Sequence, residues 1–356
     1  MEEFRLRNPK LTLETRGIAQ DLTTQITAGG ESRGVFTVGV FPFDEKNSQT
    51  KPRFIVPKEV NFGPVSNIEF PNARQEVDFT QFYELVDWAK HESRIEKAIA
   101  ALRVGQLDKV VLAETIDFPI SGLDIEKIYN FLSARDQYND NFCITFEEQQ
   151  TLIGSTPEVL VEKKGRRIYS HPLAGSLPRQ EDETVNEARG KELQKSPKNT
   201  VEHRYVVSQI ESVLSPYCEV LDVPRTPQIL RTSQMLHLGT PIVGELKEEY
   251  ANIDVNMLAQ LLHPTPAVCG TPTEVARQTI ADLEGYDRGY YAGALGWSDE
   301  RGDGRWLVSI RCANLDLAND RAQVYAGGGI VANSVVADEI VEVKAKLKAI
   351  LAALCA

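Results

Sequence analysis

The sequence predicts an α+β fold in one large domain. Apolar runs typical of strands come in antiparallel groups, helical patterns come in groups of their own, and the regular alternation of strand and helix that a doubly wound parallel sheet requires is missing. We therefore expect antiparallel β-sheets packed face to face and flanked by helices over residues 1–356. Because no domain boundary is evident after residue 90, the strands of residues 1–90 are expected to be integral to this domain.

The first third of the chain supplies strands and then helices. Short apolar runs at residues 34–43 and 53–60 predict strands, and the polar, proline-bearing segment 66–79 predicts an irregular connection. A helix is expected from Ser93, because apolar residues then recur at helical spacing. Asp124 is expected to cap a second helix over 125–135.

The remaining two thirds repeat this grouping. Residues 142–174 predict an antiparallel meander with a hairpin turn at Lys164-Gly165, and Ser196 is placed to cap a helix within a charged helical stretch. The other expected elements are strands over 108–118 and 219–246, helices over 252–262 and 272–284, hairpin strands over 290–317 and 322–331, and a terminal helix over 336–354.

Composition excludes several classes of function. The formal net charge is −12, from 51 acidic and 39 basic side chains, which argues against a nucleic-acid surface or an anionic-membrane surface. No stretch approaches the ~18 apolar residues of a membrane span, and the N-terminus lacks the pattern of a secretory signal. The five cysteines are scattered without CxxC spacing, so neither zinc nor a disulfide framework is expected. The cytoplasm is the expected location.

The glycine run Gly327–Gly329 does not match a nucleotide-binding motif. No lysine follows it as in a Walker A loop, and it lies near the C-terminus without a further strand to complete a βαβ unit. Two alternatives remain open. The run is either a bulge or tight turn at a strand end, or a loop whose free amides bind an anion.

The terminal helix favours the second alternative. Glu339, Glu342 and Lys346 stand at i, i+3 and i+7, so they project from one helical face, although such a face is more often merely solvated. Carboxylates beside anion-binding amides indicate Mg²⁺ bridging the protein to a carboxylated or phosphorylated ligand. Glu202 is a candidate second metal carboxylate or an ordinary acidic residue of a first helical turn.

Three further residues are candidates for a binding site. Arg311 interrupts an apolar strand, where it either pairs with an acid or binds a ligand carboxylate, and beside Mg²⁺ we favour the ligand. Lys109 starts a strand, where burial would suit it to be a general base. Glu158 follows a proline at a strand entry. Taken alone, Lys109 and Glu158 are more typical of surface residues.

Six ordered motifs resemble the chorismate-utilising enzymes. They are DKVVLA (108–113), GSTPEVLV (154–161), HPLAGS (171–176), HPTPAVCGTP (263–272), VSIRCANL (308–315) and YAGGGIV (325–331). The family includes isochorismate synthases, salicylate synthases, and the synthase components of anthranilate and aminodeoxychorismate synthases. The resemblance covers residues 91–350 and implies the fold of that family, with a divergent N-terminal part.

The resemblance implies roles for the candidate residues. Lys109 resembles the general base that activates water for attack at C2 of chorismate, and Glu158 resembles the general acid that protonates the departing C4 hydroxyl. The remaining implied roles are Mg²⁺ ligation by Glu202 and Glu342 with support from Glu339, carboxylate binding by Arg311 and the Gly327 amide, added positive charge from Lys346, and a ring pocket lined by Gly175, Ser176 and Ala267.

Within the family, the sequence is most similar to siderophore-type isochorismate synthases. Ala174 stands where relatives with a covalent intermediate carry a nucleophilic lysine, and Ser176 stands where salicylate and anthranilate synthases usually carry threonine. Salicylate synthase, an amination component and an inactive chorismate-binding protein remain the alternatives. We expect a monomer without a glutamine amidotransferase partner. Glu114 departs from the arginine common at its position, which puts the surroundings of Lys109 in question.

Overall fold

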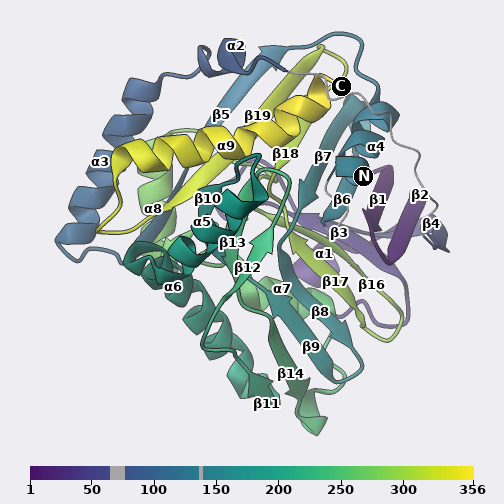
Figure 1. The fold of residues 1–356 in the computed structure, drawn as a ribbon. Helices are drawn as coiled ribbons and strands as arrows, with labels where there is room; N and C mark the ends of the chain where they lie inside the picture. Colours follow the sequence, from purple (N-terminus) through teal and green to yellow (C-terminus); the bar gives the residue numbers. More distant parts are fainter. Residues whose placement is uncertain (65–76, 136–138) are drawn as a thin grey trace.

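The computed structural model describes residues 1–64, 77–135 and 139–356, and the predicted α+β class is confirmed (Figure 1). Most of the connection expected over 66–79 lies outside the described residues. In the described part, the larger sheet has sixteen strands in the order β11-β14-β9-β8-β17-β16-β3-β4-β2-β1-β6-β7-β18-β19-β5-β15, and the smaller has the order β10-β13-β12. The strand pairs in the described part are antiparallel, from β1 with β2 to β19 with β5.

The strands of the larger sheet are β1 (Glu3–Asn8), β2 (Leu11–Asp21), β3 (Thr37–Phe41), β4 (Arg53–Gly63), β5 (Lys109–Pro119), β6 (Asp140–Thr145), β7 (Gln150–Thr156), β8 (Val159–Lys164), β9 (Arg167–His171), β11 (Cys218–Asp222), β14 (Ile242–Leu246), β15 (Gly270–Thr271), β16 (Ala294–Ser298), β17 (Gly304–Val308), β18 (Cys312–Asp316) and β19 (Arg321–Ile330). The smaller sheet consists of β10 (Leu173–Pro178), β12 (Gln228–Arg231) and β13 (Met235–Gly239).

The α-helices are α1 (Thr23–Thr27), α2 (Thr80–Tyr83), α3 (Trp88–Arg103), α4 (Ile125–Arg135), α5 (Glu183–Lys195), α6 (Pro197–Leu214), α7 (Val255–Leu262), α8 (Thr273–Glu284) and α9 (Val336–Leu354). Helix α3 begins five residues before the predicted start at Ser93, because Asp87 caps it by accepting a hydrogen bond from the Lys90 amide. Two other caps lie where they were expected. The Asp124 carboxylate accepts from the Lys127 amide, and the Ser196 hydroxyl accepts from the Asn199 amide.

The N-terminal strands belong to the same sheet as the rest of the chain. Strand β3 pairs with β16, and β1 pairs with β6, so residues from both ends of the sequence alternate across the sheet. The sheet carries large buried side chains, including Phe41, Phe54 and Trp306, whose rings pack together. Burial of such apolar surface stabilises the fold by roughly 25 cal/mol per Å².

Helix α9 crosses the sheet over β19, as Figure 1 shows. Its apolar side chains, such as Leu347 and Leu351, are buried against the sheet, while Glu339 and Glu342 near its start are buried with them. Helix α6 packs against β10 of the smaller sheet. These two helices therefore bring acidic side chains from distant parts of the sequence towards the same end of β19 and β10. Of the described helices, none is long and apolar enough to cross a membrane.

Candidate active site

One cavity lies between the two sheets and α9, and it encloses about 640 Å³ including the part open to solvent. All of the residues proposed from the sequence line it except Lys109 and Glu339. The lining residues include Val111, Glu158, Leu173, Ala174, Gly175, Ser176, Glu202, His237, Ala267, Tyr291, Arg311, Tyr325, Gly327, Gly329, Glu342 and Lys346.

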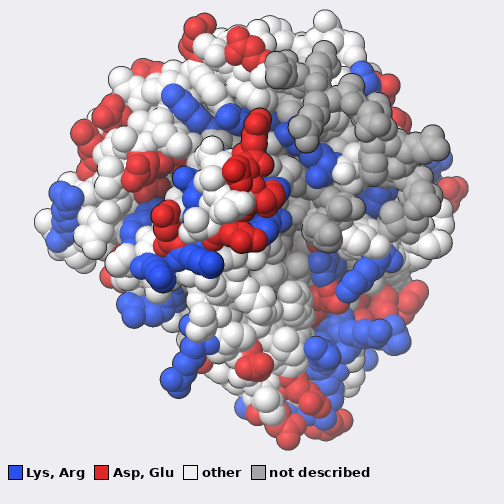
Figure 2. Space-filling view, in the orientation of Figure 1, with Lys and Arg blue, Asp and Glu red and all other residues white. Residues whose placement is uncertain are grey.

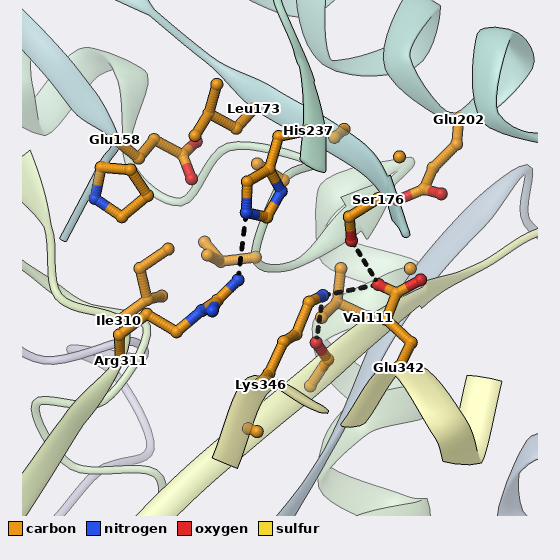
Figure 3. A pocket seen from close by; sticks show the side chains of 18 of the residues that line it. Val111, Glu158, Leu173, Ser176, Glu202, His237, Ile310, Arg311, Glu342 and Lys346 are labelled. Atoms are coloured by element: carbon orange, nitrogen blue, oxygen red, sulfur yellow. Dashed lines mark hydrogen bonds and ion pairs between the residues drawn. The ribbon is translucent and has the colours of Figure 1, made fainter. Parts of the chain in front are cut away.

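A hydrogen-bonded group from α9 and β10 forms one end of the cavity (Figure 3). The Ser176 hydroxyl donates to Glu342 Oε1 over 2.9 Å, and Lys346 Nζ lies 2.6 Å from the same oxygen. Lys346 also donates to the carbonyl of Gly327 over 2.7 Å. The ammonium of Lys346 is thus held at the cavity wall between a carboxylate and a strand carbonyl, where it can contribute positive charge to an anionic ligand.

Arg311 enters the cavity from a connection between two strands. The sequence placed it within an apolar strand, but it lies between β17 and β18 with a φ of 54°, in the left-handed region. This backbone turn directs its guanidinium towards His237, to which Nη2 donates over 3.3 Å. Burial lowers the pKa of His237 well below its ordinary value, so a neutral ring accepts from the guanidinium. The strained turn and the neutral histidine together orient the guanidinium fork.

Glu158 lies on the opposite side of the cavity from Glu202 and Glu342 (Figure 3). It stands between β7 and β8 and is 3% exposed. Burial raises the pKa of its carboxyl to about 7, although the Leu173 amide and the positive charge of Lys109 act in the opposite direction. A carboxyl with this pKa is substantially protonated at neutral pH and can donate a proton to a bound ligand.

Lys109 is fully buried at the start of β5. Its Nζ lies 3.4 Å from Glu202 Oε1. Burial lowers the pKa of Lys109, while the negative charge of Glu202 opposes that change. The structure therefore contradicts the surface lysine that the local sequence favoured, and the role of Lys109 as a base stays a prediction.

Glu202 and Glu339 are joined by a lysine that the sequence analysis did not identify. Lys198 Nζ lies 3.3 Å from Glu202 Oε2 and 2.9 Å from Glu339 Oε1. Burial disfavours the charge of Glu202, but the neighbouring lysines, Lys198 foremost, outweigh it and lower its pKa to about 2. In Glu339 burial dominates and raises the pKa to about 7. The pKa of Glu202 is therefore lowered and that of Glu339 is raised, although both carboxyls contact the ammonium of Lys198.

The glycine run continues the strand that was expected over 322–331, so it is neither a tight turn nor a loop, while binding of an anion by its amides stays a prediction. Gly327–Gly329 lie within β19 and pair in register with Val111–Ala113 of β5. The absence of side chains matters most at Gly329, where a Cβ atom would lie 2.0 Å from Glu202 Oε1. At Gly328 a Cβ would lie 3.3 Å from Glu339 Oε2. The glycines thus make room for the carboxylates of α6 and α9 against the strand.

These carboxylates fit a divalent cation in composition. The Oε2 atom of Glu339 is buried without a hydrogen-bond partner among the described residues, and carboxylate oxygens are the ligands that Mg²⁺ prefers. However, within residues 1–64, 77–135 and 139–356, no three acidic, histidine or cysteine side chains are already arranged to hold a metal ion. Glu202 and Glu339 face Lys198, and Glu342 faces Ser176 and Lys346. Coordination of a cation would require these side chains to reorient.

Glu114 is separated from the cavity by the strand that carries it. Its carboxylate accepts from Arg94 over 2.9 Å and lies 3.2 Å from His91 Nδ1, and both of these residues belong to α3. It stands five positions from Lys109 on β5, an odd separation that points the two side chains to opposite faces. Glu114 therefore joins β5 to α3 instead of contacting Lys109.

Two residues of the site were missed from the sequence. Lys198 stands four residues before Glu202, a spacing that pairs side chains on a helix and could have identified it. His237 lies in the apolar strand β13, and its sequence context carries no comparable signal. Its contact with Arg311 depends on the approach of β13 to the β17–β18 connection.

Comparison with known proteins identifies the family of this chain. The sequence profile described as "chorismate binding enzyme" matches residues 64–355. The chain belongs to the chorismate-binding enzyme family. It is 35% identical over 356 residues to isochorismate synthase DhbC of Bacillus subtilis, covering 98% of this chain and 87% of that protein. It is also 35% identical over 316 residues to the vibriobactin-specific isochorismate synthase of Vibrio cholerae, covering 88% and 78% of the two chains.

Solved structures show the same fold. The structure of DhbC from Bacillus anthracis matches with a TM-score of 0.87 and 33% identity, covering 99% of this chain and 96% of the other. Anthranilate synthase component I from Streptococcus pneumoniae matches with a TM-score of 0.73 at 21% identity, over 98% and 89% of the chains, which is a likeness of fold alone. The family and fold predicted from the six motifs are thereby confirmed.

Proposed function

We propose that this chain is an isochorismate synthase, which adds water at C2 of chorismate and removes the C4 hydroxyl to form isochorismate reversibly. The observation that carries the proposal is a pair of buried residues beside one cavity, Lys109 with a lowered pKa and Glu158 with a raised pKa. The same cavity also presents the Arg311 guanidinium. The isochorismate synthases of Bacillus subtilis and Vibrio cholerae support the choice of reaction within the family.

In the proposed reaction two protons move and water is both consumed and released. Neutral Lys109 removes a proton from the attacking water as its oxygen bonds to C2, and the ring double bonds shift. Protonated Glu158 donates its proton to the C4 hydroxyl, which leaves as water because hydroxide is a poor leaving group. The opposite shifts of the two pKa values suit each residue to its role at neutral pH. Reprotonation of Glu158 and deprotonation of Lys109 restore the starting state.

The substrate carries two carboxylates, and the cavity offers a separate partner for each. We assign the enolpyruvyl carboxylate to Arg311 and the Gly327 amide, with Lys346 adding positive charge. The ring carboxylate would meet a Mg²⁺ ion held by Glu202 and Glu342 with support from Glu339, and the ion would supply charge neutralisation there. Ser176, Gly175 and Ala267 line the space for the ring.

The surroundings favour an isomerase over the other reactions of the family. Ala174 lies in the cavity wall, where it offers no nucleophile for a covalent intermediate.

We propose that residues 1–356 form a single catalytic domain that acts as a monomer without a glutamine amidotransferase and that its product feeds siderophore synthesis. Figure 2 shows acidic and basic side chains interspersed on one face of the molecule, so this face does not form a continuous basic surface.

Product analysis tests the proposal directly. Purified protein is incubated with chorismate and Mg²⁺, with and without ammonia, and the products are separated by chromatography while pyruvate is assayed with lactate dehydrogenase. We expect isochorismate that equilibrates with chorismate, no pyruvate and no effect of ammonia. Stoichiometric pyruvate would instead indicate a salicylate or anthranilate synthase, and an ammonia requirement would indicate an amination component. Absence of any conversion would support an inactive chorismate-binding protein.

A further inference from the structure

Lys198 has an unusual position, because its ammonium lies where a cation shared by Glu202 and Glu339 would be expected. Its Nζ is 2.9 Å from one carboxylate and 3.3 Å from the other. Mg²⁺ binds carboxylate oxygens at about 2.1 Å, so an ammonium in this position and a metal ion would use the same oxygens. The two cations cannot occupy the space between these carboxylates together.

Lys198 lies in a cluster of acidic and basic side chains. The carboxyl groups of Glu202, Glu339 and Glu342 and the amino groups of Lys109, Lys198 and Lys346 meet at this end of the cavity. Lys346 also donates to the Gly327 carbonyl, whereas both ion pairs of Lys198 are with acids of this cluster. The side chain of Lys198 is 20% exposed, against 14% for Lys346 and 0% for Lys109.

The backbone beneath Lys198 is fixed. Helix α6 begins at Pro197, and Ser196 caps it through the Asn199 amide. A change at this position is therefore confined to the long, flexible lysine side chain. Rotation of that side chain would free one oxygen of Glu202 and one of Glu339, next to the Oε2 atom of Glu339 that is already without a partner among the described residues.

We propose that Lys198 is a displaceable counter-cation that neutralises the carboxylates before the divalent ion binds, moves away when it binds, and thereby weakens the affinity of the site for Mg²⁺. This inference rests on the proposed function, because the ion belongs to it. Because the negative ring carboxylate of the substrate is attracted to the divalent ion, it strengthens Mg²⁺ binding, and the two ligands bind cooperatively. Lys198 is thus a positioning residue that links occupancy by metal to occupancy by substrate.

Calorimetric titration with Mg²⁺ tests the proposal without reference to activity. At pH 8 and in the absence of chorismate, Lys198→Met is expected to bind Mg²⁺ about 10-fold or more tightly than the wild type, because a unit charge beside a divalent ion has been removed. The matched control is Lys195→Met, which removes the same charge from an exposed position three residues away. This control is expected to change the affinity by less than about twofold at physiological ionic strength.

Thermal unfolding gives an independent readout. Without metal, Lys198→Met is expected to melt below the wild type, because Glu202 and Glu339 lose their shared partner, and saturating Mg²⁺ should raise its melting temperature more than it raises that of the wild type. Lys198→Arg retains the charge and should keep wild-type affinity. Lys198→Gln serves as the second neutral variant if Lys198→Met does not fold.

The outcomes separate the two proposals. Equal or weaker Mg²⁺ binding by the folded neutral variants, with normal isochorismate formation by the wild type, would overturn the role of Lys198 alone. If the wild type and all variants bind no Mg²⁺ and form isochorismate without it, both the metal requirement of the proposed function and the role of Lys198 fall. If Lys195→Met binds Mg²⁺ as tightly as Lys198→Met does, the change in affinity is a long-range charge effect. That result would also overturn the proposal that Mg²⁺ displaces the Lys198 ammonium.

Discussion

Replacing Glu158 with glutamine is expected to make the protein more stable and much less active, and the gain in stability depends on pH. The glutamine has nearly the same shape but never ionises. Burial raises the pKa of Glu158 from 4.5 to about 7 in the folded protein. Between pH 4.5 and about pH 7, the folded state therefore retains the proton of Glu158 while the unfolded state releases it. The stability linked to the group is present below pH 4.5 and is lost as pH rises through 7.

The size of the effect follows from the shift in pKa. The pKa of Glu158 differs by roughly 2.5 between the folded and unfolded states, and a pKa difference of one corresponds to about 1.4 kcal/mol. At pH 8 the ionised carboxyl therefore lowers the free energy of unfolding by about 3 kcal/mol. With an unfolding entropy of about 2.1 cal/mol/K per residue, a chain of 356 residues gains roughly 4 °C in melting temperature. Glu158→Gln should thus melt about 4 °C above the wild type at pH 8 and close to it at pH 4.5.

Scanning calorimetry at the two pH values measures this difference, with Glu187→Gln as a control because Glu187 is exposed on α5. In the same preparation, turnover of chorismate by Glu158→Gln should fall by roughly 10² to 10⁴-fold, as expected for loss of a general acid. A stabilised and inactive variant cannot be explained by misfolding. An equal melting difference at both pH values, or full activity, would refute the assignment of Glu158 as a buried acid.

Three other substitutions test the cavity. Gly329→Ala adds a Cβ atom that would collide with Glu202 Oε1, so turnover should fall by about 10-fold or more, while Gly63→Ala, whose Cβ meets no atom of the described residues within 4 Å, should leave kcat unchanged. Arg311→Lys loses the bidentate fork, and we expect KM for chorismate to rise by roughly 10 to 100-fold in steady-state assays; an unchanged KM would remove Arg311 from substrate binding. Glu342→Ala should raise the Mg²⁺ concentration that gives half-maximal rate, and an unaltered Mg²⁺ titration would contradict its role as a ligand.

Short-range patterns in the sequence were reliable guides to local structure. The helical spacing of Glu339 and Glu342 predicted that both would project from one face of a helix, and both carboxylates lie near the same glycine run. Asp124 and Ser196 cap the helices that were expected from their positions. These features depend on residues within one or two turns of each other, so the local chain is sufficient to predict them.

Features that depend on distant strands were predicted less well. A strand was expected over 322–331, but with a bulge, turn or loop at its glycine run, and pairing with β5, more than two hundred residues away in the sequence, continues the strand through all three glycines. Arg311 was expected within a strand, and it lies in a left-handed connection where β13 supplies a partner. Glycine and arginine have weak or ambiguous local preferences, so tertiary pairing decides their conformation.

Local periodicity and motifs in a fixed order were enough to predict the fold class, the family and most of the side chains around the cavity. The pKa shifts and the pairing of those side chains depend on tertiary packing. It buries Lys109 and Glu158 so that their pKa values move in opposite directions, and it brings Lys198 between two acids. Burial and the distance between charges depend on how remote segments pack, and no local pattern specifies either quantity.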